Sequence, residues 1–259
     1  MKKTSIIALV VTTYICFSAT ATAAKAPVFT PEQEARIGEV ASDYLLAHPE
    51  ILVQVSQKLQ VQQREKQQQV YAMKVMDNLK PLTADPDTPV IGPADAHVAV
   101  IEFFDYQCVH CSNLAPTIEK VMKQRADVQY IFKEWPIFGG RWENSALAAN
   151  RGLAIWKAAG AEAYLEYHNG IYRTGHIEGN LTASDIEEAT KPALLSAVKT
   201  KDMSAALERN DSLAQALGLT GTPGLIVLPL KNATPAKITV IPGAVGAEQL
   251  MAAIDKAGR

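Results

Sequence analysis

The stretch that decides the fold reads Val98-Ala99-Val100-Ile101-Glu102-Phe103-Phe104-Asp105-Tyr106-Gln107-Cys108-Val109-His110-Cys111. Its first seven residues are almost all apolar, β-branched or aromatic, which is typical of a short strand buried on both faces of a sheet. The two cysteines then stand three residues apart, where a helical pattern begins that continues to Gln124. A strand that leads directly into a Cys-x-x-Cys pair and a helix predicts an α/β domain with a dithiol beside the sheet.

The rest of the chain follows an α/β order with an inserted helical block. A second strand is expected over residues 128–134, and its last two residues, Lys133 and Glu134, are expected to be solvated because they are charged and end the strand. Further elements are expected as helices within about 141–217, including separate helices at 145–157 and 161–172, strands at 225–228 and 237–241, and a closing helix at 247–256. This order predicts the α/β class.

The first residues have the three parts of a secretory signal peptide. Two lysines precede an apolar run over residues 5–17, and small residues follow up to Ala23. The run is too short to span a bilayer. Residues 1–23 are therefore predicted to be cleaved and the mature protein to be exported. Cleavage would also remove Cys16, which leaves the Cys-x-x-Cys pair as the only cysteines.

Composition and charge exclude several classes of protein. Cleavage takes away two lysines and no acidic residue, so 25 basic and 27 acidic residues become 23 and 27, a net charge of −4 with histidine neutral. This balance excludes a strongly basic nucleic-acid-binding protein. With 48% hydrophobic and 20% charged residues the chain can build a sizeable core, which excludes a disordered protein.

Residues 24–80 are predicted to form a helical arm. Thr30, Pro31 and Gln33 provide an N-cap, a proline in the first turn and a capping-box glutamine. A second helix is expected to start at Pro49. It has a narrow apolar stripe and a glutamine-rich middle. Because such a stripe has no core of its own, the arm is expected to pack on another copy of the chain or on a partner. A solvated helix that lies on its own domain is the alternative.

Residues 81–96 contain four prolines among acidic and small residues. A Pro-rich connection is semi-rigid. The segment is therefore predicted to be a linker that separates the arm from a domain at residues 97–259.

Cys108 and Cys111 carry the predicted chemistry as a redox dithiol. At the N-terminus of a helix, unpaired N–H groups and the helix dipole stabilise a thiolate, so Cys108 is expected to attack and the deeper Cys111 to resolve. His110 lies between them and is expected to lower the pKa of Cys108 further, which would make the disulfide more oxidising. An exposed histidine with no redox role is the alternative.

Other interpretations of the cysteine pair are weaker. A structural disulfide would close a loop too small to restrain the unfolded chain. A structural zinc site needs four ligands, and the sequence has no second Cys-x-x-Cys and no histidine pair. Capture of a soft ion such as Cu(I) by Cys108, His110 and Cys111 stays open, as does a chaperone-like binding module. The main interpretation requires no metal and no other cofactor.

The stretch from Val100 to Cys111 resembles the active-site segment of the DsbA family of thiol:disulfide oxidoreductases. The resemblance extends over most of residues 97–259 and implies a thioredoxin fold with an inserted helical domain at about 141–217. It implies a periplasmic protein that acts on unfolded or misfolded secreted proteins and exchanges electrons with a membrane redox partner. In that family an acidic residue stands six positions before the first cysteine, and Glu102 has this position here. A histidine precedes the second cysteine, as His110 does.

A second segment, Gly221-Thr222-Pro223-Gly224, resembles the cis-proline loop of the same family, which faces the cysteines and binds substrate. Glu102 is expected to transfer protons as sulfurs are released, with an acid that reaches water at the strand edge as the alternative. Val109 and Thr222 differ from the strongest oxidases, and Thr222 resembles the isomerase branch. Together with the arm, this resembles the oligomeric ScsC-like members and implies a homodimer or trimer.

Overall fold

The computed structural model describes residues 28–193 and 202–259, so the predicted signal peptide lies outside the described residues. The chain divides into two compact units, with the boundary between Lys58 and Leu59. Among the described helices, none is both long and apolar enough to cross a membrane.

The first unit contains helix α1 (Pro31–Ala47) and the start of α2 (Glu50–Asp77). The predicted capping box is confirmed: the Gln33 N–H donates to Thr30 Oγ1 (3.3 Å), and the Thr30 N–H donates to Gln33 Oε1 (2.9 Å). No residue of α1 is buried. Its apolar side chains include Ile37, Val40 and Tyr44, which recur at helical spacing and are each about half exposed or more. Residues 28–58 of this unit therefore have no core of their own.

The second unit is built on a five-stranded mixed sheet. After the short helix α3 (Leu79–Thr83), the strands are β1 (Val90–Ile91), β2 (Val98–Phe104), β3 (Gln129–Glu134), β4 (Gly224–Pro229) and β5 (Thr239–Pro242). Their order is β1-β3-β2-β4-β5, in which β2 is parallel to β3 and antiparallel to β4. The central strand β2 is buried along its whole length, as its sequence predicts.

Helices cover both faces of this sheet. They are α4 (Val109–Gln124), α5 (Glu143–Arg173), α6 (Ala183–Thr190), α7 (Ser204–Leu217) and α8 (Ala247–Gly258), with short 3-10 turns at Lys191–Ala193 and Pro235–Lys237. Gly160 interrupts α5 with φ 78°, which confirms the prediction of two successive helices there.

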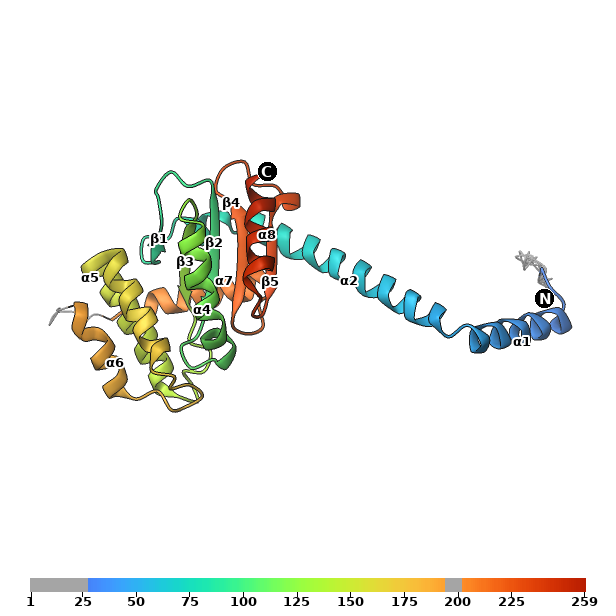
Figure 1. The fold of residues 1–259 in the computed structure, drawn as a ribbon, viewed down its shortest axis with the longest axis horizontal. Coiled ribbons are helices and arrows are strands. Elements are labelled where there is room, and N and C mark those ends of the chain that lie inside the picture. Colours follow the sequence, from blue (N-terminus) through green and yellow to red (C-terminus); the bar gives the residue numbers. More distant parts are fainter. Residues whose placement is uncertain (1–27, 194–201) are drawn as a thin grey trace, which may run out of the picture. The chain divides into compact units, whose positions relative to one another are not determined.

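The side chains of β2 alternate between two cores. On one face, called here the dithiol face, they pack with α4, α5 and α8, and on the opposite face with the end of α2 and with α7. Figure 1 shows α4 and α8 on one side of the sheet and α7 on the other. The dithiol face carries Val98, Val100, Glu102 and Phe104, and the opposite face carries Ala99, Ile101 and Phe103.

Residues 81–96 do not form the predicted separating linker. Leu82 is fully buried in the core of the opposite face, and β1 pairs with β3 in antiparallel orientation. Ala72 and Val75 of α2 are buried in the same core. The prolines of residues 81–96 predict a separate linker, but proline content is a local signal and does not report tertiary packing. In the structure the unit that contains the dithiol begins at Leu59.

Candidate active site

Cys108 lies at the N-terminus of α4, at the end of the short loop that follows β2. It is the N-cap residue, with φ −80° and ψ 120°, and its side chain makes no cap hydrogen bond. Its carbonyl oxygen accepts the first bond of the helix, from the Ser112 N–H (3.0 Å). Cys111, in the first turn, is fully buried. Both cysteines are free thiols.

The sheet brings the Thr222–Pro223 segment to the same place. Because β4 is antiparallel to β2, the start of β4 lies beside the end of β2, and Gly224 pairs with Phe103. The Thr222–Pro223 peptide bond is cis. The Cys108 thiol donates to the Thr222 carbonyl oxygen at 3.2 Å. Two segments 114 residues apart in sequence therefore meet at the Cys108 sulfur.

The surroundings of Cys108 favour its thiolate. A hydrogen bond from the Cys111 thiol is the largest of the causes that lower the pKa of Cys108 from 9.0 to about 6. The Thr222 side chain and the backbone N–H groups of Cys111 and His110 add to this effect, while burial opposes it. The buried Thr222 hydroxyl has no hydrogen-bond partner elsewhere in the described part of the chain, so it is available to the sulfur.

The pKa of Cys111 moves in the opposite direction. Burial is the largest cause that raises it, and the hydrogen bond with Cys108 and the negative charge on Cys108 and Glu102 raise it further. The pair thus consists of an ionised sulfur at the helix terminus and a protonated sulfur one turn deeper. This is the asymmetry that the position of the motif predicts.

His110 is exposed in the first turn of α4. Its imidazole makes no hydrogen bond with any residue that the structure describes. Its backbone N–H is among the groups that lower the pKa of Cys108, a contribution that any residue other than proline would make. A redox role for the imidazole therefore remains a prediction.

Glu102 is buried on the dithiol face of β2, where it pairs with Phe132 of β3 and Leu225 of β4. Burial, followed by the negative charge of Cys108, raises its pKa from 4.5 to about 8. The carboxyl group makes no hydrogen bond within the described residues. It is therefore a buried acid that is able to gain or lose a proton near neutral pH and that responds to the charge on Cys108.

Glu134 is a second buried acid on the dithiol face, although its charge and its place at the end of a strand predict a solvated side chain. Its Oε1 accepts hydrogen bonds from the hydroxyls of Tyr106 and Tyr164, both at 2.9 Å, whereas Oε2 is buried without a partner in the described chain. Burial raises its pKa well above the usual value. The alternation along β3 could have placed it, because Tyr130 and Phe132 share its face.

Lys133 lies on the opposite face and is also fully buried. Its Nζ donates to the Pro81 carbonyl oxygen (2.9 Å) and to Thr88 Oγ1 (2.7 Å), and Asp85 Oδ2 lies at 3.9 Å. The expectation that Lys133 and Glu134 are solvated was wrong. Their partners come from residues 81–88, from Tyr106 after β2 and from Tyr164 of α5, which the sequence of β3 does not reveal.

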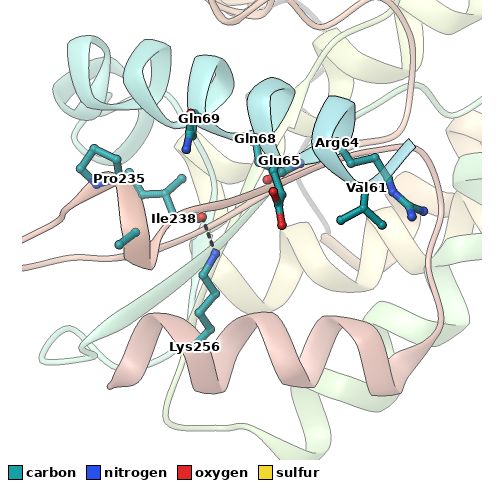
Figure 2. A pocket seen from close by; sticks show the side chains of 9 residues that line it. Val61, Arg64, Glu65, Gln68, Gln69, Pro235, Ile238 and Lys256 are labelled. Carbon is teal, nitrogen blue, oxygen red and sulfur yellow. Dashed lines mark hydrogen bonds between the residues drawn. The ribbon is translucent and has the colours of Figure 1, made fainter. Parts of the chain in front are cut away.

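A cavity of about 680 Å³ lies away from the cysteines, between the second half of α2, the turn at Pro235–Lys237 and α8. Figure 2 shows Gln68 and Glu65 on one side of this cavity and Ile238 and Lys256 on the other. The Gln68 amide donates to the Val240 carbonyl oxygen (2.6 Å) and accepts from the Val240 N–H (3.1 Å). Lys256 Nζ donates to the Ile238 carbonyl oxygen (3.0 Å). These bonds satisfy backbone polar groups of β5, and of Ile238 just before it, at the edge of the sheet.

Within residues 28–193 and 202–259, no group of three or more His, Cys, Asp or Glu side chains is arranged to hold a metal ion. The site provides one sulfur with a lowered pKa, one sulfur with a raised pKa, and a buried carboxyl group whose pKa depends on the charge of Cys108. This combination suits the exchange of a dithiol with a disulfide.

Comparisons with known proteins agree with this geometry. Residues 84–239 match the family described as Thioredoxin, and residues 33–66 match the family described as Copper resistance protein ScsC N-terminal domain. Disulfide bond formation protein D of Bacillus subtilis is 28% identical over 54% of this chain and 67% of its own length.

Two solved structures are similar over most of the chain. BcfH of Salmonella enterica Typhimurium is 38% identical, with a TM-score of 0.74 over 88% of this chain and 97% of its own. The catalytic domain of Proteus mirabilis ScsC is 29% identical, with a TM-score of 0.61 over 73% of this chain and 99% of its own. The chain therefore belongs to the thioredoxin family, as a thiol:disulfide oxidoreductase of the DsbA-like, ScsC-like type.

Proposed function

We propose that this protein forms or isomerises disulfides in exported proteins, with Cys108 as the nucleophile and Cys111 as the resolving thiol. The observation that carries the proposal is the contrast between the two sulfurs: Cys108 has a pKa lowered to about 6 and faces the Thr222 carbonyl oxygen, while the buried Cys111 has a raised pKa. A thiolate at neutral pH is both the attacking group and the better leaving group in thiol–disulfide exchange.

As an oxidase the protein would begin as a Cys108–Cys111 disulfide. A client thiolate attacks the Cys108 sulfur, and Cys111 leaves as a thiolate that takes up a proton. A second client thiolate then attacks the client sulfur of the mixed disulfide, and Cys108 leaves as a stabilised thiolate. The client gains one disulfide and the protein gains two electrons.

As an isomerase the protein would begin as the dithiol. The Cys108 thiolate attacks a wrongly paired client disulfide and releases one client thiolate. That thiolate attacks a second client disulfide, and the client sulfur freed in this exchange displaces Cys108 from the mixed disulfide. Client and protein end with the same numbers of electrons as before. Cys111 rescues stalled complexes by attacking the Cys108 sulfur, which releases the client.

Glu102 fits the role of proton carrier for Cys111. Burial raises the pKa of Glu102 and, while Cys108 is a thiolate, its negative charge raises it further, so the carboxyl group holds its proton. Once Cys108 is bound in a mixed disulfide that charge is gone, and Glu102 ionises more readily. It is then able to accept the proton of Cys111 as Cys111 attacks.

Thr222 and Pro223 fit the role of substrate contacts, because they lie against the Cys108 sulfur at the start of β4. Residues 28–58 fit the role of a self-association arm, because they carry exposed apolar residues and no buried side chain. Joining two or three copies would place several Cys108 sulfurs around one client. The same assembly would favour isomerisation over docking to a membrane oxidase, so a reducing membrane partner would keep the dithiol reduced.

Export to the periplasm remains a proposal based on residues 1–23, which lie outside the described residues. One related structure is described as a periplasmic thioredoxin-like protein from Salmonella enterica serovar Typhimurium, and this supports the same compartment.

The decisive experiment measures reactivation of scrambled ribonuclease and reduction of insulin by the full mature chain. Cys108→Ser should abolish both activities, and Cys111→Ser should trap mixed disulfides with the client. If Cys108→Ser retains activity, the dithiol is not the site, and a chaperone-like or metal-binding role becomes the better explanation.

The arm is tested separately with Val40→Lys combined with Tyr44→Lys, and with Ser42→Lys as the matched control on the same helix. The double variant should lower the molar mass measured by light scattering, and it should lose most of the isomerase activity. Alkylation of Cys108 should stay unchanged. An unaltered molar mass would contradict self-association through this face of α1.

A further inference from the structure

Gln107, the residue directly before Cys108, is almost completely buried. Its backbone N–H donates to Asp105 Oδ1 (2.8 Å), and its carbonyl oxygen accepts from the Glu178 N–H (3.0 Å). Its side-chain Oε1 accepts from the Gly179 N–H (2.7 Å). Two successive N–H groups of one loop therefore hold the main chain and the side chain of the same residue.

The loop that supplies these N–H groups has an unusual backbone. Glu178 has φ 52° and Gly179 has φ 96°, so two successive residues lie at positive φ. Glycine adopts such a conformation freely, but glutamate does so only when surrounding contacts enforce it. A Cβ on residue 179 would lie 2.8 Å from Trp142 Nε1, so the loop backbone is packed closely against that indole. The loop is thus fixed in a costly conformation that directs both N–H groups at Gln107.

Burial of the Gln107 side chain at this position is energetically unfavourable. Its Nε2 is buried without a hydrogen-bond partner among the described residues, and an unpaired buried donor is unfavourable. Methionine would occupy a similar volume without that cost. What a glutamine adds is the Oε1 acceptor for Gly179, so this acceptor is the feature that explains the residue.

Asp105 fixes the other end of the same segment. Its Oδ2 accepts from Ser145 Oγ (2.6 Å) at the start of α5 and from the Phe138 N–H (2.9 Å). Its carbonyl oxygen accepts from the Cys108 N–H (3.1 Å). Residues 105–108 are therefore tied to the β3–α5 loop, to α5 and, through Gln107, to the loop at 178–179.

We propose that Gln107 is a positioning residue of the dithiol reaction: it anchors the peptide before Cys108 to the loop at residues 178–179 and so holds the Cys108 sulfur against Thr222. This inference deepens the proposed function and rests on it. The helical insertion then contributes to the active site through these two N–H groups, although it supplies neither sulfur. Freed from this anchor, Cys108 would rotate away from the Thr222 side chain and from the N–H groups of α4 that stabilise its thiolate.

The test is Gln107→Met in the full mature chain, which keeps the volume and removes the acceptor. The titration of the Cys108 thiolate, followed by its ultraviolet absorbance, should show a pKa raised by about one, which corresponds to about tenfold slower alkylation below that pKa. Asn210→Leu is the matched control, because it removes another buried side-chain amide, one that lies on α7 and donates to the Glu134 carbonyl oxygen (3.0 Å). It should leave the pKa of Cys108 unchanged.

Glu178→Gly is a second control. It relaxes the backbone while keeping the N–H group, so it too should leave the pKa of Cys108 as it is. If Gln107→Met lowers the melting temperature as Asn210→Leu does but leaves the pKa and the alkylation rate of Cys108 at their wild-type values, Gln107 is merely structural and the proposal is overturned.

Should Gln107→Met fail to fold, Gln107→Asn gives the same test with a polar side chain too short to reach Gly179. Amide hydrogen exchange in the wild-type protein gives an independent one: the Glu178 and Gly179 amides should be protected, and rapid exchange at both would overturn the anchor. These measurements do not involve client proteins. A wild-type protein that neither oxidises nor isomerises clients would refute the proposed function while leaving the role of Gln107 in holding Cys108 to be decided by its pKa.

Discussion

Both faces of the sheet bury ionisable side chains, but they differ in how many hydrogen-bond partners those side chains have. On the opposite face, Lys133 has two oxygen acceptors within 2.9 Å and the carboxylate of Asp85 at 3.9 Å. On the dithiol face, Glu102 has no hydrogen bond in the described chain, and Glu134 has one unpartnered oxygen. A buried charge with its partners in place holds the fold together. A buried acid without such partners is able to exchange protons. Glu102 is such an acid, and it is close enough to Cys108 for the charge of that sulfur to raise its pKa.

At any single pH near neutrality, a large loss of stability is expected from Lys133→Met, which removes the buried cation of the opposite face. The substitution leaves Asp85 and the acceptors at Pro81 and Thr88 without their buried cation, so it should destabilise the protein by about 3 kcal/mol. Urea denaturation measures this. Lys157→Met is the control, because Lys157 pairs with Asp87 at a partly exposed site, and it should cost less than about 1 kcal/mol. Equal costs would remove the distinction between the two faces.

Lys133→Met is expected to destabilise the protein, whereas Glu102→Gln should stabilise it above acidic pH. Folding raises the pKa of Glu102 from 4.5 to about 8, so the native state binds the proton more tightly than the unfolded state. The wild type therefore loses stability as pH rises from about 4.5 to 8, by at most about 1.4 kcal/mol per pH unit. The variant lacks this loss, so the gap between the two should open with pH in urea denaturation.

The same variant tests the proposed role of Glu102 in proton transfer. Resolution of a mixed disulfide by Cys111 should slow by about a hundredfold or more, while the equilibrium redox potential changes little. Stopped-flow fluorescence and a glutathione titration measure the two quantities. A large change in potential at a normal rate would show that Glu102 acts through its charge alone.

The redox state should itself make stability depend on pH. The pKa of Cys108 falls from 9.0 to about 6 in the folded dithiol, so the thiolate stabilises the reduced protein progressively as pH rises from about 6 to 9. The oxidised protein has no thiolate. The difference in free energy of unfolding between the two forms should therefore grow with pH, by at most about 1.4 kcal/mol per unit. A difference that is constant across this range would contradict the lowered pKa.

Gln68→Leu should produce a smaller effect on the opposite face. It removes the two hydrogen bonds to Val240, at a cost of about 1 kcal/mol, and should speed amide exchange at Val240. The neighbouring Gln69→Leu provides a matched control on the same helix, because Gln69 is exposed. Equal exchange rates at Val240 in both variants would show that Gln68 does not secure the strand.

The smallest effect is expected from His110→Ala. The backbone N–H that contributes to the pKa of Cys108 remains in the variant, and the imidazole is exposed. The pKa of Cys108 should therefore rise by less than about one. A larger rise, seen by thiolate absorbance, would assign the imidazole the stronger role that the sequence motif suggests.

Features set by local signals could be predicted from the sequence. The run Val98–Phe104 predicted the central strand, the capping box at Thr30 predicted the start of α1, and Gly160 separated two helical patterns. The place of Cys108 at a helix N-terminus followed from the motif and already implied unequal sulfurs.

Features set by distant partners could not be predicted. The strand β1 is two residues long and has no periodicity to detect. The burial of Lys133 depends on oxygens at Pro81 and Thr88, and the hydrogen bonds of Glu134 depend on Tyr106 and Tyr164. None of these partners is a neighbour in sequence. For the same reason the prolines of residues 81–96 suggested a free spacer where the structure has a segment packed on the sheet.

The hydrogen bonds at β5 protect an exposed edge of the sheet. An edge strand with unpaired N–H and C=O groups is a template on which unfolded chains extend a sheet. Here the Val240 groups are occupied by Gln68, the Ile238 carbonyl oxygen is occupied by Lys256, and Pro242 has no N–H to offer. An unfolded chain that approaches this edge finds its bonding positions taken. The side chains of Gln68 and Lys256 therefore protect β5 from sheet extension by another chain, including the unfolded clients of the proposed function.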